Sequence, residues 1–402
     1  MYDAIKERDI KLAAIFVTLT VFVTRFNISA GVLMNGFLLL LSACLLCFST
    51  KRIFPLTTEI KIYLKVFLVF FLSIIPSILF SGRIFDSFCF FFFMLCQYGG
   101  FILIILLIRK RKYLVWMLTA FFIFSGFDCL LSLFQLIAGQ AWDNRGYGFG
   151  GKLLTLADIM CMLLPMALVI LMDSRFEMKL RKSAAFASIG VIVGLLCNKS
   201  RGAWLTELIV VPIAVFRYLK QNRKYLIAFA LVILGMVGYM ATNPQYVQRI
   251  RSITNTTTDY SNADRIWTWK SAQRMIMDHP VTGVGFGLFH EKYEKHYKYE
   301  QETQNLPHTH NNFIQVAVEC GIIGTIGFLY FVCVCLYTSL RNYRKCINPY
   351  DLLIFTIFLA HICLFGQIDY TIWVSPGMQP IFLFLLAILL RLKETDTIIC
   401  KV

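Results

Sequence analysis

The feature that most restricts the fold of this sequence is a succession of long apolar stretches separated by short basic segments. A helix needs about 20 apolar residues to cross the hydrocarbon core of a bilayer. The pattern therefore predicts an all-α, polytopic integral membrane protein with about 12 transmembrane helices. The candidate spans lie near residues 10–24, 30–49, 62–81, 86–108, 113–138, 151–172, 184–197, 202–218, 225–241, 311–339, 350–371 and 376–392.

Composition and charge agree with a membrane protein. Only 15% of the 402 residues are charged and 58% are hydrophobic, whereas a soluble protein carries roughly a quarter charged residues. Most lysines and arginines fall in alternate connections between the spans, which predicts that both termini are cytoplasmic. Because topology explains the net charge of +16, that charge does not indicate nucleic-acid binding. The N-terminal stretch lacks a small-residue cleavage site and is interpreted as a first anchor.

The apolar pattern divides the chain into three parts. Residues 1–241 hold nine predicted spans. Residues 242–309 form one large loop, which is expected outside the cytoplasm and to contain helices. Residues 310–402 hold three more spans and a cytoplasmic tail.

Two cations interrupt the positive-inside trend in the stretch "CNKSRGAWLTE" (197–207). Lys199 and Arg201 are predicted at the outer end, between the seventh and eighth spans. They could simply extend their long side chains to the interface. Alternatively they bind an anion, since a guanidinium fork suits a phosphate better than an ammonium group does.

The stretch "SNADRIWTWKSAQRMIMDHPVTGVGFG" (261–287) predicts a helix that Ser261 or Asn262 caps and that ends near His279. Its apolar face is expected at the outer membrane surface, with its tryptophans at headgroup depth. Arg265 would lie in the first turn, where a cation opposes the helix dipole. A bound anion would explain why an arginine stands at this position. The alternative is that Arg265 is an ordinary surface arginine.

The third stretch, "HTHNNFIQVAVECGIIG" (308–324), stands at the start of a predicted span. His310 and Gly321 are eleven residues apart, close to three helical turns, so we expect them on one helix face. Gly321 and Gly324 would let another helix approach closely. His310 could serve as a base or only as a polar cap. His308 and His310 could suggest zinc, but without a Cys or carboxylate cluster we expect no metal site.

Acidic residues are also biased towards the predicted outer side. Asp158, Glu207, Glu319 and Asp369 each fall there within or beside a span. Each could be a structural partner for a nearby polar group, but together they suggest a polar chamber that opens outward. Asp369 is expected near the depth of Arg201 and His310, where it could orient His310 or pair with an arginine.

These motifs resemble those of the O-antigen ligase family. His310, Asn311, Gly321 and Gly324 fit the family signature, which is His, then Asn, Ser or Gln, nine residues, Gly, two residues, and Gly, Thr or Tyr. "KSRGAWL" and "ADRIWTW" resemble its two arginine motifs, and "HPVTGVGFG" resembles its loop. The resemblance implies a GT-C-like membrane glycosyltransferase of the bacterial inner membrane with a periplasmic active site. It would transfer O-antigen from undecaprenyl pyrophosphate to a lipid A–core sugar, without a cofactor or metal.

The resemblance also implies roles for single residues. Arg201 and Arg265 would hold the pyrophosphate, and His310 would take the proton of the acceptor hydroxyl in an inverting displacement. Substrate contacts are further predicted for a second group of residues, namely Asn311, Asp369, Lys199 and His308. The expected partners are the lipid-linked donor, the lipid A–core acceptor and membrane lipids, with no nucleic acid.

Other functions remain open at this stage. An O-antigen polymerase or a protein O-oligosaccharyltransferase would use the same donor. A transporter or lipid flippase would be expected to show repeats, broken helices and polar residues at the midplane. A scaffold for envelope assembly would make no use of the arginines.

Overall fold

The computed structural model describes residues 7–48, 56–302, 304–372 and 377–399. Over these residues the chain is helical, and no strand occurs apart from an isolated bridge between Trp142 and Arg145. The long helices are α1 (Glu7–Phe26), α2 (Ile28–Phe48), α3 (Thr58–Leu79), α4 (Ile84–Cys96), α5 (Gly99–Leu107), α6 (Arg111–Ile137), α7 (Leu153–Met172), α8 (Met178–Asn198), α9 (Arg201–Gln221), α10 (Arg223–Thr242), α14 (Asn312–Cys346), α15 (Pro349–Phe358) and α16 (Gln379–Ile399).

These helices confirm an all-α, polytopic membrane fold. Ten segments of the described chain are long and apolar enough to cross a bilayer, and α4 with α5 counts as one of them. The first and last predicted spans fall on α1 and α16, which are not among the ten. The predicted span 350–371 is shorter in the structure. There α15 continues as a π-helix, η3 (Leu359–Leu364), and a 3-10 turn, η4 (Phe365–Gln367). The predicted bounds 49 and 376 lie outside the described residues.

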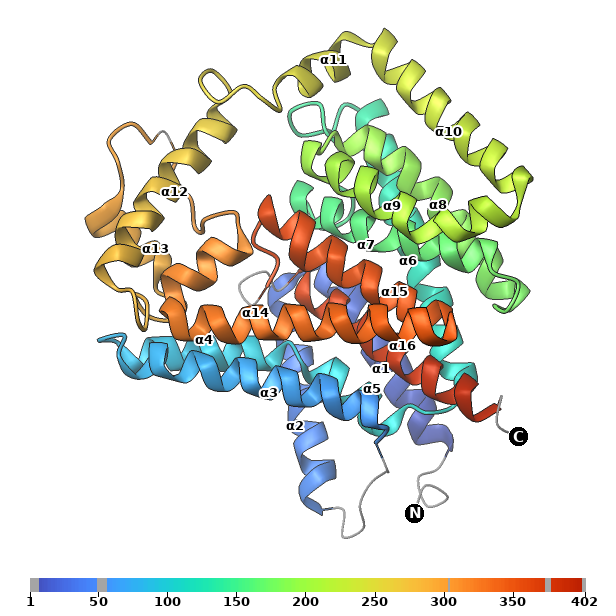
Figure 1. Ribbon diagram of the computed structural model, residues 1–402, viewed down its shortest axis with the longest axis horizontal. Coiled ribbons are helices and arrows are strands. Elements are labelled where there is room, and N and C mark those ends of the chain that lie inside the picture. Colours follow the sequence, from blue (N-terminus) through green and yellow to red (C-terminus); the bar gives the residue numbers. More distant parts are fainter. Residues whose placement is uncertain (1–6, 49–55, 303, 373–376, 400–402) are drawn as a thin grey trace.

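Helix α7 forms the centre of the bundle. Almost all its side chains are buried, and it packs against α8, α9 and α15. In contrast, α10 has no buried residue and lies along the outside of the bundle (Figure 1). Most hydrophobic side chains of α10 are exposed and are expected to face lipid, whereas Phe229 packs against the bundle.

Buried ion pairs join helices that are distant in the sequence. Arg25 of α1 contacts Asp128 of α6, with 2.7 Å between Nε and Oδ2. His361 of η3 contacts Asp158 of α7, with 2.8 Å between Nδ1 and Oδ2. The expected outward chamber shared by Asp158, Glu207, Glu319 and Asp369 is wrong, because Asp369 lines the cavity described below and the other three do not. Asp158 is fully buried against His361, and Glu319 accepts from Gln315.

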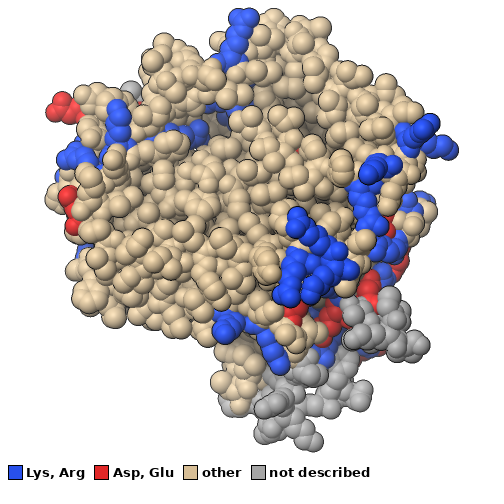
Figure 2. Space-filling view, in the orientation of Figure 1, with Lys and Arg blue, Asp and Glu red and all other residues tan. Residues whose placement is uncertain are grey.

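The segment between α10 and α14 forms a separate layer. It contains α11 (Pro244–Arg251), α12 (Tyr260–Asp278), α13 (Phe289–Lys292) and a short π-helix, η2 (Tyr293–Tyr297). Figure 1 shows this layer at the top and left, whereas α1 begins and α16 ends at the lower right. Lysines and arginines gather at the right of the face in Figure 2, on the side where α16 ends. This distribution fits the predicted orientation, which itself remains a prediction.

Helix α14 is broken at Gly321, where the backbone has φ 58° and ψ −159°. The loop after α12 enters the break. The amides of Val284 and Gly285 donate to the carbonyls of Val318 and Glu319, at 2.9 and 3.2 Å. In return the amides of Ile322 and Ile323 donate to the carbonyls of Pro280 and Val281, at 2.9 and 3.4 Å. The loop therefore satisfies the backbone groups that the break exposes.

Two expectations about α14 are consequently wrong. Gly321 does not admit a neighbouring helix, because an added Cβ would lie 2.4 Å from the backbone of Val281 and 2.6 Å from the amide nitrogen of Gly283. The space is occupied by a loop. His310 also lies before the helix, so the two residues do not share a helix face. The spacing of 3.6 residues per turn does not apply to this pair, because His310 precedes the helix cap and Gly321 lies at the break.

Candidate active site

His310 lies immediately before α14 in a left-handed backbone conformation, with φ 52°. The next residue, Asn311, caps the helix, because its Oδ1 accepts from the amides of Phe313 and Ile314 at 2.9 and 3.1 Å. Residues other than glycine rarely have a positive φ. Such conformations persist where surrounding contacts fix them, and they concentrate at functional sites.

The loop before His310 is tied to both neighbouring elements. The amide of Thr309 donates to Oε1 of Gln315 on α14 at 2.8 Å. Its carbonyl accepts from Nε1 of Trp269 on α12, also at 2.8 Å. The N–H of Trp269 therefore bonds inside the protein, although its ring was expected at headgroup depth. This bond connects α12 directly to the histidine loop.

Two asparagines fix the segment that follows η4 against the tip of α14. Asn311 Nδ2 donates to Oε1 of Gln367 at 2.8 Å. Asn312 donates to the hydroxyl of Thr371 and accepts from its amide, both at 2.9 Å. Asp369 lies between these two attachments. The end of the penultimate span, which carries Asp369, is thereby held beside His310, although Asp369 and His310 are 59 positions apart in the sequence.

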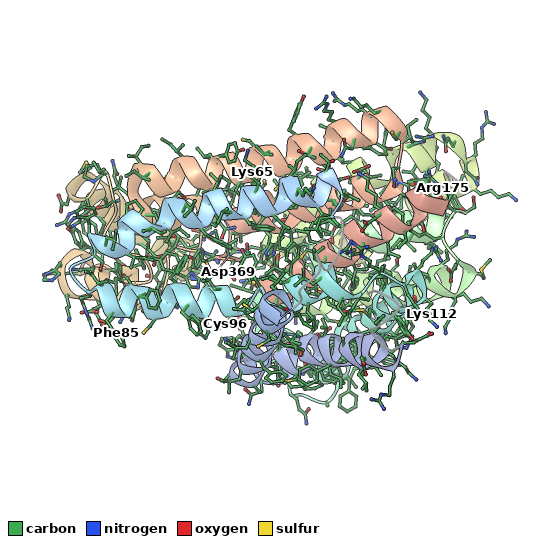
Figure 3. The ribbon with its side chains drawn as sticks, turned by 90° about the horizontal axis from the view of Figure 1, so that it is seen from below. Lys65, Phe85, Cys96, Lys112, Arg175 and Asp369 are labelled. Carbon is green, nitrogen blue, oxygen red and sulfur yellow. The ribbon has the colours of Figure 1, made fainter. Side chains whose placement is uncertain are left out.

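Asp369 accepts a hydrogen bond from His310, with 2.8 Å between Oδ1 and Nδ1. A carboxylate can only accept, so Nδ1 carries the hydrogen and Nε2 of the neutral ring keeps its lone pair. Burial alone would raise the pKa of Asp369, but the bond from His310 and the two nearby histidines outweigh it and lower that pKa. In Figure 3, Asp369 lies within the bundle, nearer to Phe85 than to Lys112 and Arg175. The pair can orient His310 and stabilise its protonated form.

His308 is the second histidine of this site. Its Nδ1 accepts from the amide of His310 at 3.2 Å, so its Nε2 carries a hydrogen. That Nε2 lies 3.9 Å from Oδ1 of Asp369. Burial, followed by repulsion from His310 when that ring is protonated, lowers the pKa of His308 to about 3. His308 is therefore neutral near pH 7.

The two histidines and Asp369 also meet the distance requirement for a metal site, since their ligand atoms lie within 4.8 Å of one another. The sequence reasoning had found no carboxylate for the histidine pair, and the structure supplies one. However, the histidine nitrogens that face Asp369 both carry hydrogen atoms in this bonding pattern. The arrangement is thus a hydrogen-bonded group, whereas metal ligation requires bare nitrogens. That no metal is needed stays a prediction.

Arg265 lies in α12, as the sequence predicted, but the helix is capped by Asp259 and begins at Tyr260. Neither Ser261 nor Asn262 is the cap. The guanidinium of Arg265 makes no hydrogen bond or ion pair with any of the described residues. Burial lowers its pKa, and the charge of Asp369 opposes that effect. Arg265 is therefore a cation that is available for a ligand.

Arg201 is the first residue of α9, and Ser200 caps that helix. Its Nη1 lies 2.8 Å from Oδ2 of Asp259 and 2.8 Å from the carbonyl oxygen of Ser252. It also donates to Asn262. Arg201 thus secures the connection between α11 and α12, and Asp259 neutralises much of its charge.

Two other predicted contact residues point elsewhere. Lys199 Nζ donates to Oε1 of Gln245 at 2.7 Å and lies over the ring of Tyr246. The amide of Asn311 caps α14 through Oδ1 and donates from Nδ2 to Gln367. Neither residue lines the two cavities described next.

The site opens into two adjoining cavities. The larger has a volume of about 580 Å³ and contains His308, His310 and Asp369 in its wall. The smaller, of about 290 Å³, contains Arg201 and Arg249. Four residues line both cavities: Arg145, Leu154, Ser261 and Arg265. Arg201 and His310 therefore belong to neighbouring cavities that Arg265 joins.

Sequence reasoning missed Arg145, Lys152 and Arg249 as cavity residues. A signal was present for Arg145. Asp143 and Asn144 both have positive φ, and the amides and carbonyls of Trp142 and Arg145 bond to each other across them. An Asp-Asn pair is typical of such a tight turn. The turn is readable from the sequence, but the cavity that it faces is not.

Comparison with known proteins gives two kinds of finding. Residues 184–329 match the O-antigen ligase family, which confirms the resemblance that the motifs predicted. Arg201, Arg265 and His310 lie inside this segment, whereas Asp369 and Arg145 lie outside it.

Two curated relatives match parts of the chain. "Putative polysaccharide ligase" of Rickettsia conorii is 31% identical over 143 residues, which cover 33% of this chain and 33% of that protein. An uncharacterized protein of Haemophilus influenzae is 23% identical over 185 residues, which cover 42% of this chain and 46% of that protein. The matches therefore span less than half the length of either relative.

Proposed function

We propose, from the premise that residues 184–329 form an O-antigen ligase family domain, that this chain is an O-antigen ligase. It would transfer O-antigen polysaccharide from undecaprenyl pyrophosphate to a lipid A–core sugar in lipopolysaccharide biosynthesis. The family and the named relative support a polysaccharide ligase or polymerase type of activity in a multi-pass bacterial membrane protein. The specific donor, acceptor and periplasmic active site belong to the proposal.

One observation carries the mechanism. The wall of a single cavity holds His310, bonded through Nδ1 to Asp369, together with Arg265, which has no partner among the described residues. A base with its lone pair available and a guanidinium group without a hydrogen-bond partner among the described residues suit a reaction that removes a proton at one end and expels an anion at the other.

The chemistry follows from these positions. Nε2 of His310 takes the proton of the acceptor hydroxyl while that oxygen forms a bond to the anomeric carbon of the donor sugar. The bond from that carbon to the pyrophosphate oxygen breaks, and the electron pair stays with the pyrophosphate. Direct displacement inverts the anomeric centre. The pyrophosphate ester of the donor already stores the energy for the transfer, so no ATP is required. Arg265 and Arg201 stabilise the departing charge, so the mechanism needs no metal ion.

The same donor would serve an O-antigen polymerase or a protein O-oligosaccharyltransferase. The three activities differ only in the acceptor hydroxyl that reaches His310. Supplying purified protein with lipid A–core, with a second lipid-linked glycan or with an acceptor protein separates them. We expect transfer to lipid A–core.

The test in cells uses a strain that lacks its own ligase. His310→Ala, Arg201→Ala and Arg265→Ala should each weaken or abolish the lipopolysaccharide ladder, with a loss of about 10²–10⁴-fold for the base. His296→Ala and Arg251→Ala are matched controls, since both residues are exposed in the same layer. Normal ladders from all three test variants, at equal protein levels, would contradict the assignment.

Metal independence needs its own measurement. The purified protein should keep its transfer rate after treatment with a chelator. A strict requirement for a divalent ion would instead favour ligation by His308, His310 and Asp369 and would overturn the role of His310 as a base.

A further inference from the structure

The smaller cavity has an unusual charge. Its wall contains four guanidinium groups, those of Arg145, Arg201, Arg249 and Arg265. Asp143 lies in the same wall, and Asp259 pairs with Arg201. Guanidinium groups therefore outnumber carboxylates in the wall of this cavity of about 290 Å³. Partly buried like charges repel one another and call for a compensating anion.

Two of these arginines have donors that no described residue uses. Arg249 Nε is buried without a hydrogen-bond partner. Arg145 donates from Nε to the carbonyl of Asn198 at 2.8 Å, and its two terminal nitrogens make no hydrogen bond within the described chain. Burial and the neighbouring arginines lower the pKa of both side chains. That of Arg145 falls to about 10, so Arg145 remains cationic near pH 7.

The local fold explains why these arginines meet. Asn198, at the end of α8, donates to the carbonyls of Gly146 and Leu153 at 2.9 and 3.1 Å. The turn that presents Arg145 is thus fixed beside the start of α9, where Arg201 lies. On the opposite side, α11 begins with Pro244 after the Asn243 cap and carries Arg249. The arrangement is built from ordered elements.

We propose that Arg145 and Arg249 complete the binding site for the donor pyrophosphate, with Arg145 at the phosphate that bears the sugar and Arg249 at the phosphate that bears the lipid. This inference rests on the proposed function and adds two residues to it. A pyrophosphate diester carries two negative charges, which suit a wall where guanidinium groups outnumber carboxylates, and the departing group carries a further one.

The order of the phosphates follows from the two cavities. Arg145 lines both, so it lies where the smaller cavity meets the wall that holds His310. The anomeric carbon must reach an acceptor oxygen beside His310, which places the sugar-bearing phosphate at this junction. Arg249 lines only the smaller cavity, together with the apolar Leu205 and Ile253. Leu205 is also exposed on the outer face of α9, where a lipid tail could continue.

The two positions predict different kinetic effects. Charge grows on the phosphate beside Arg145 as the sugar leaves, so Arg145→Gln should lower kcat by about 10²-fold. Arg249 contacts a phosphate whose charge changes less. Arg249→Gln should therefore raise KM for the donor by roughly tenfold to a hundredfold, with a smaller change in kcat.

The experiment uses the full chain in detergent with a lipid-linked glycan and lipid A–core, and it measures kcat and KM. Arg251→Gln is the matched control, because Arg251 lies on the same helix as Arg249 but is exposed outside both cavities. Inorganic pyrophosphate serves as a probe of the site. It should inhibit the native protein competitively with the donor, and its inhibition constant should rise in both glutamine variants but not in the control.

The outcomes are distinguishable. If Arg145→Gln and Arg249→Gln behave like Arg251→Gln while Arg265→Gln loses activity, the inference fails and the proposed function stands. If Arg265→Gln and His310→Ala also behave like the control, the proposed function fails. If a glutamine variant does not fold, the lysine variant replaces it. A lysine keeps the charge but not the forked donor, so intermediate pyrophosphate inhibition supports the site and unchanged inhibition overturns it.

Discussion

Replacing Gly321 with alanine should disrupt the point where the outer loop enters α14. The added Cβ would meet backbone atoms of Val281 and Gly283 at 2.4 and 2.6 Å, and backbone cannot rotate away as a side chain can. The conformation itself, with φ 58° and ψ −159°, is one that residues other than glycine avoid. The variant must therefore move the loop, the helix or both.

The magnitude follows from two contributions. Holding a residue other than glycine in this backbone region costs about 1–3 kcal/mol. Four backbone hydrogen bonds cross the break, and each contributes about 0.5–1.5 kcal/mol net. If two of the four are lost, the total destabilisation is about 2–6 kcal/mol. Since the same loop follows α12, which carries Arg265, transfer activity should fall as well.

The assay compares thermal unfolding in detergent for the native protein, Gly321→Ala and a control. Gly235→Ala in the exposed helix α10 is matched, because nothing lies within 4 Å of its added Cβ. The control should unfold at or slightly above the native temperature, since alanine favours a helix by about 1 kcal/mol over glycine. A Gly321→Ala protein that is as stable and as active as this control would refute the reasoning.

Three further results are expected. Asp369→Asn should lower kcat by about 10²–10⁴-fold in the transfer assay with little change in KM, because an amide neither fixes the tautomer of His310 nor stabilises its protonated form. An unchanged kcat would show that the hydrogen bond between His310 and Asp369 has no role in catalysis. The pKa of His308 is lowered from 6.5 to about 3 in the folded protein, so between these pH values the unfolded chain binds a proton that the folded chain does not. The free energy of unfolding should therefore decrease as the pH drops below 6.5. Melting curves of His308→Gln should show a smaller decrease in melting temperature over the same pH range. Asn312→Ala removes three hydrogen bonds, one of them to the Ile362 carbonyl, and should lower the melting temperature and kcat together.

Much of the fold follows from the sequence, because spans are selected by a local property. A stretch such as 153–172 is apolar enough to identify itself without knowledge of its neighbours. The break at Gly321 is different. A glycine in an apolar run is compatible with an intact helix, and only the loop at 280–285 makes the break favourable by supplying hydrogen bonds. The sequence carries no signal of these hydrogen bonds between the loop and the broken helix.

In the site, too, local motifs could be read from the sequence, whereas contacts between distant segments could not. His310, Arg201 and Arg265 stand in motifs within a hundred or so residues, and their order could be read directly. Asp369 was placed near His310 only by depth, since its position depends on bonds from Asn311 and Asn312 to a segment beyond the next span. Arg145 was missed because its importance comes from the cavity it faces.

The break in α14 also explains how a base and a cation on separate elements can keep a fixed separation. The part before Gly321 carries His310 at its tip and is bonded to the loop that follows α12. Trp269 of α12 makes a second attachment, to the carbonyl of Thr309. Arg265 lies one helical turn before Trp269, on the helix that both of these attachments bind to the histidine segment. The position of Arg265 relative to His310 is thus set by direct bonds within the outer layer, and movement of the spans in the bilayer need not alter it.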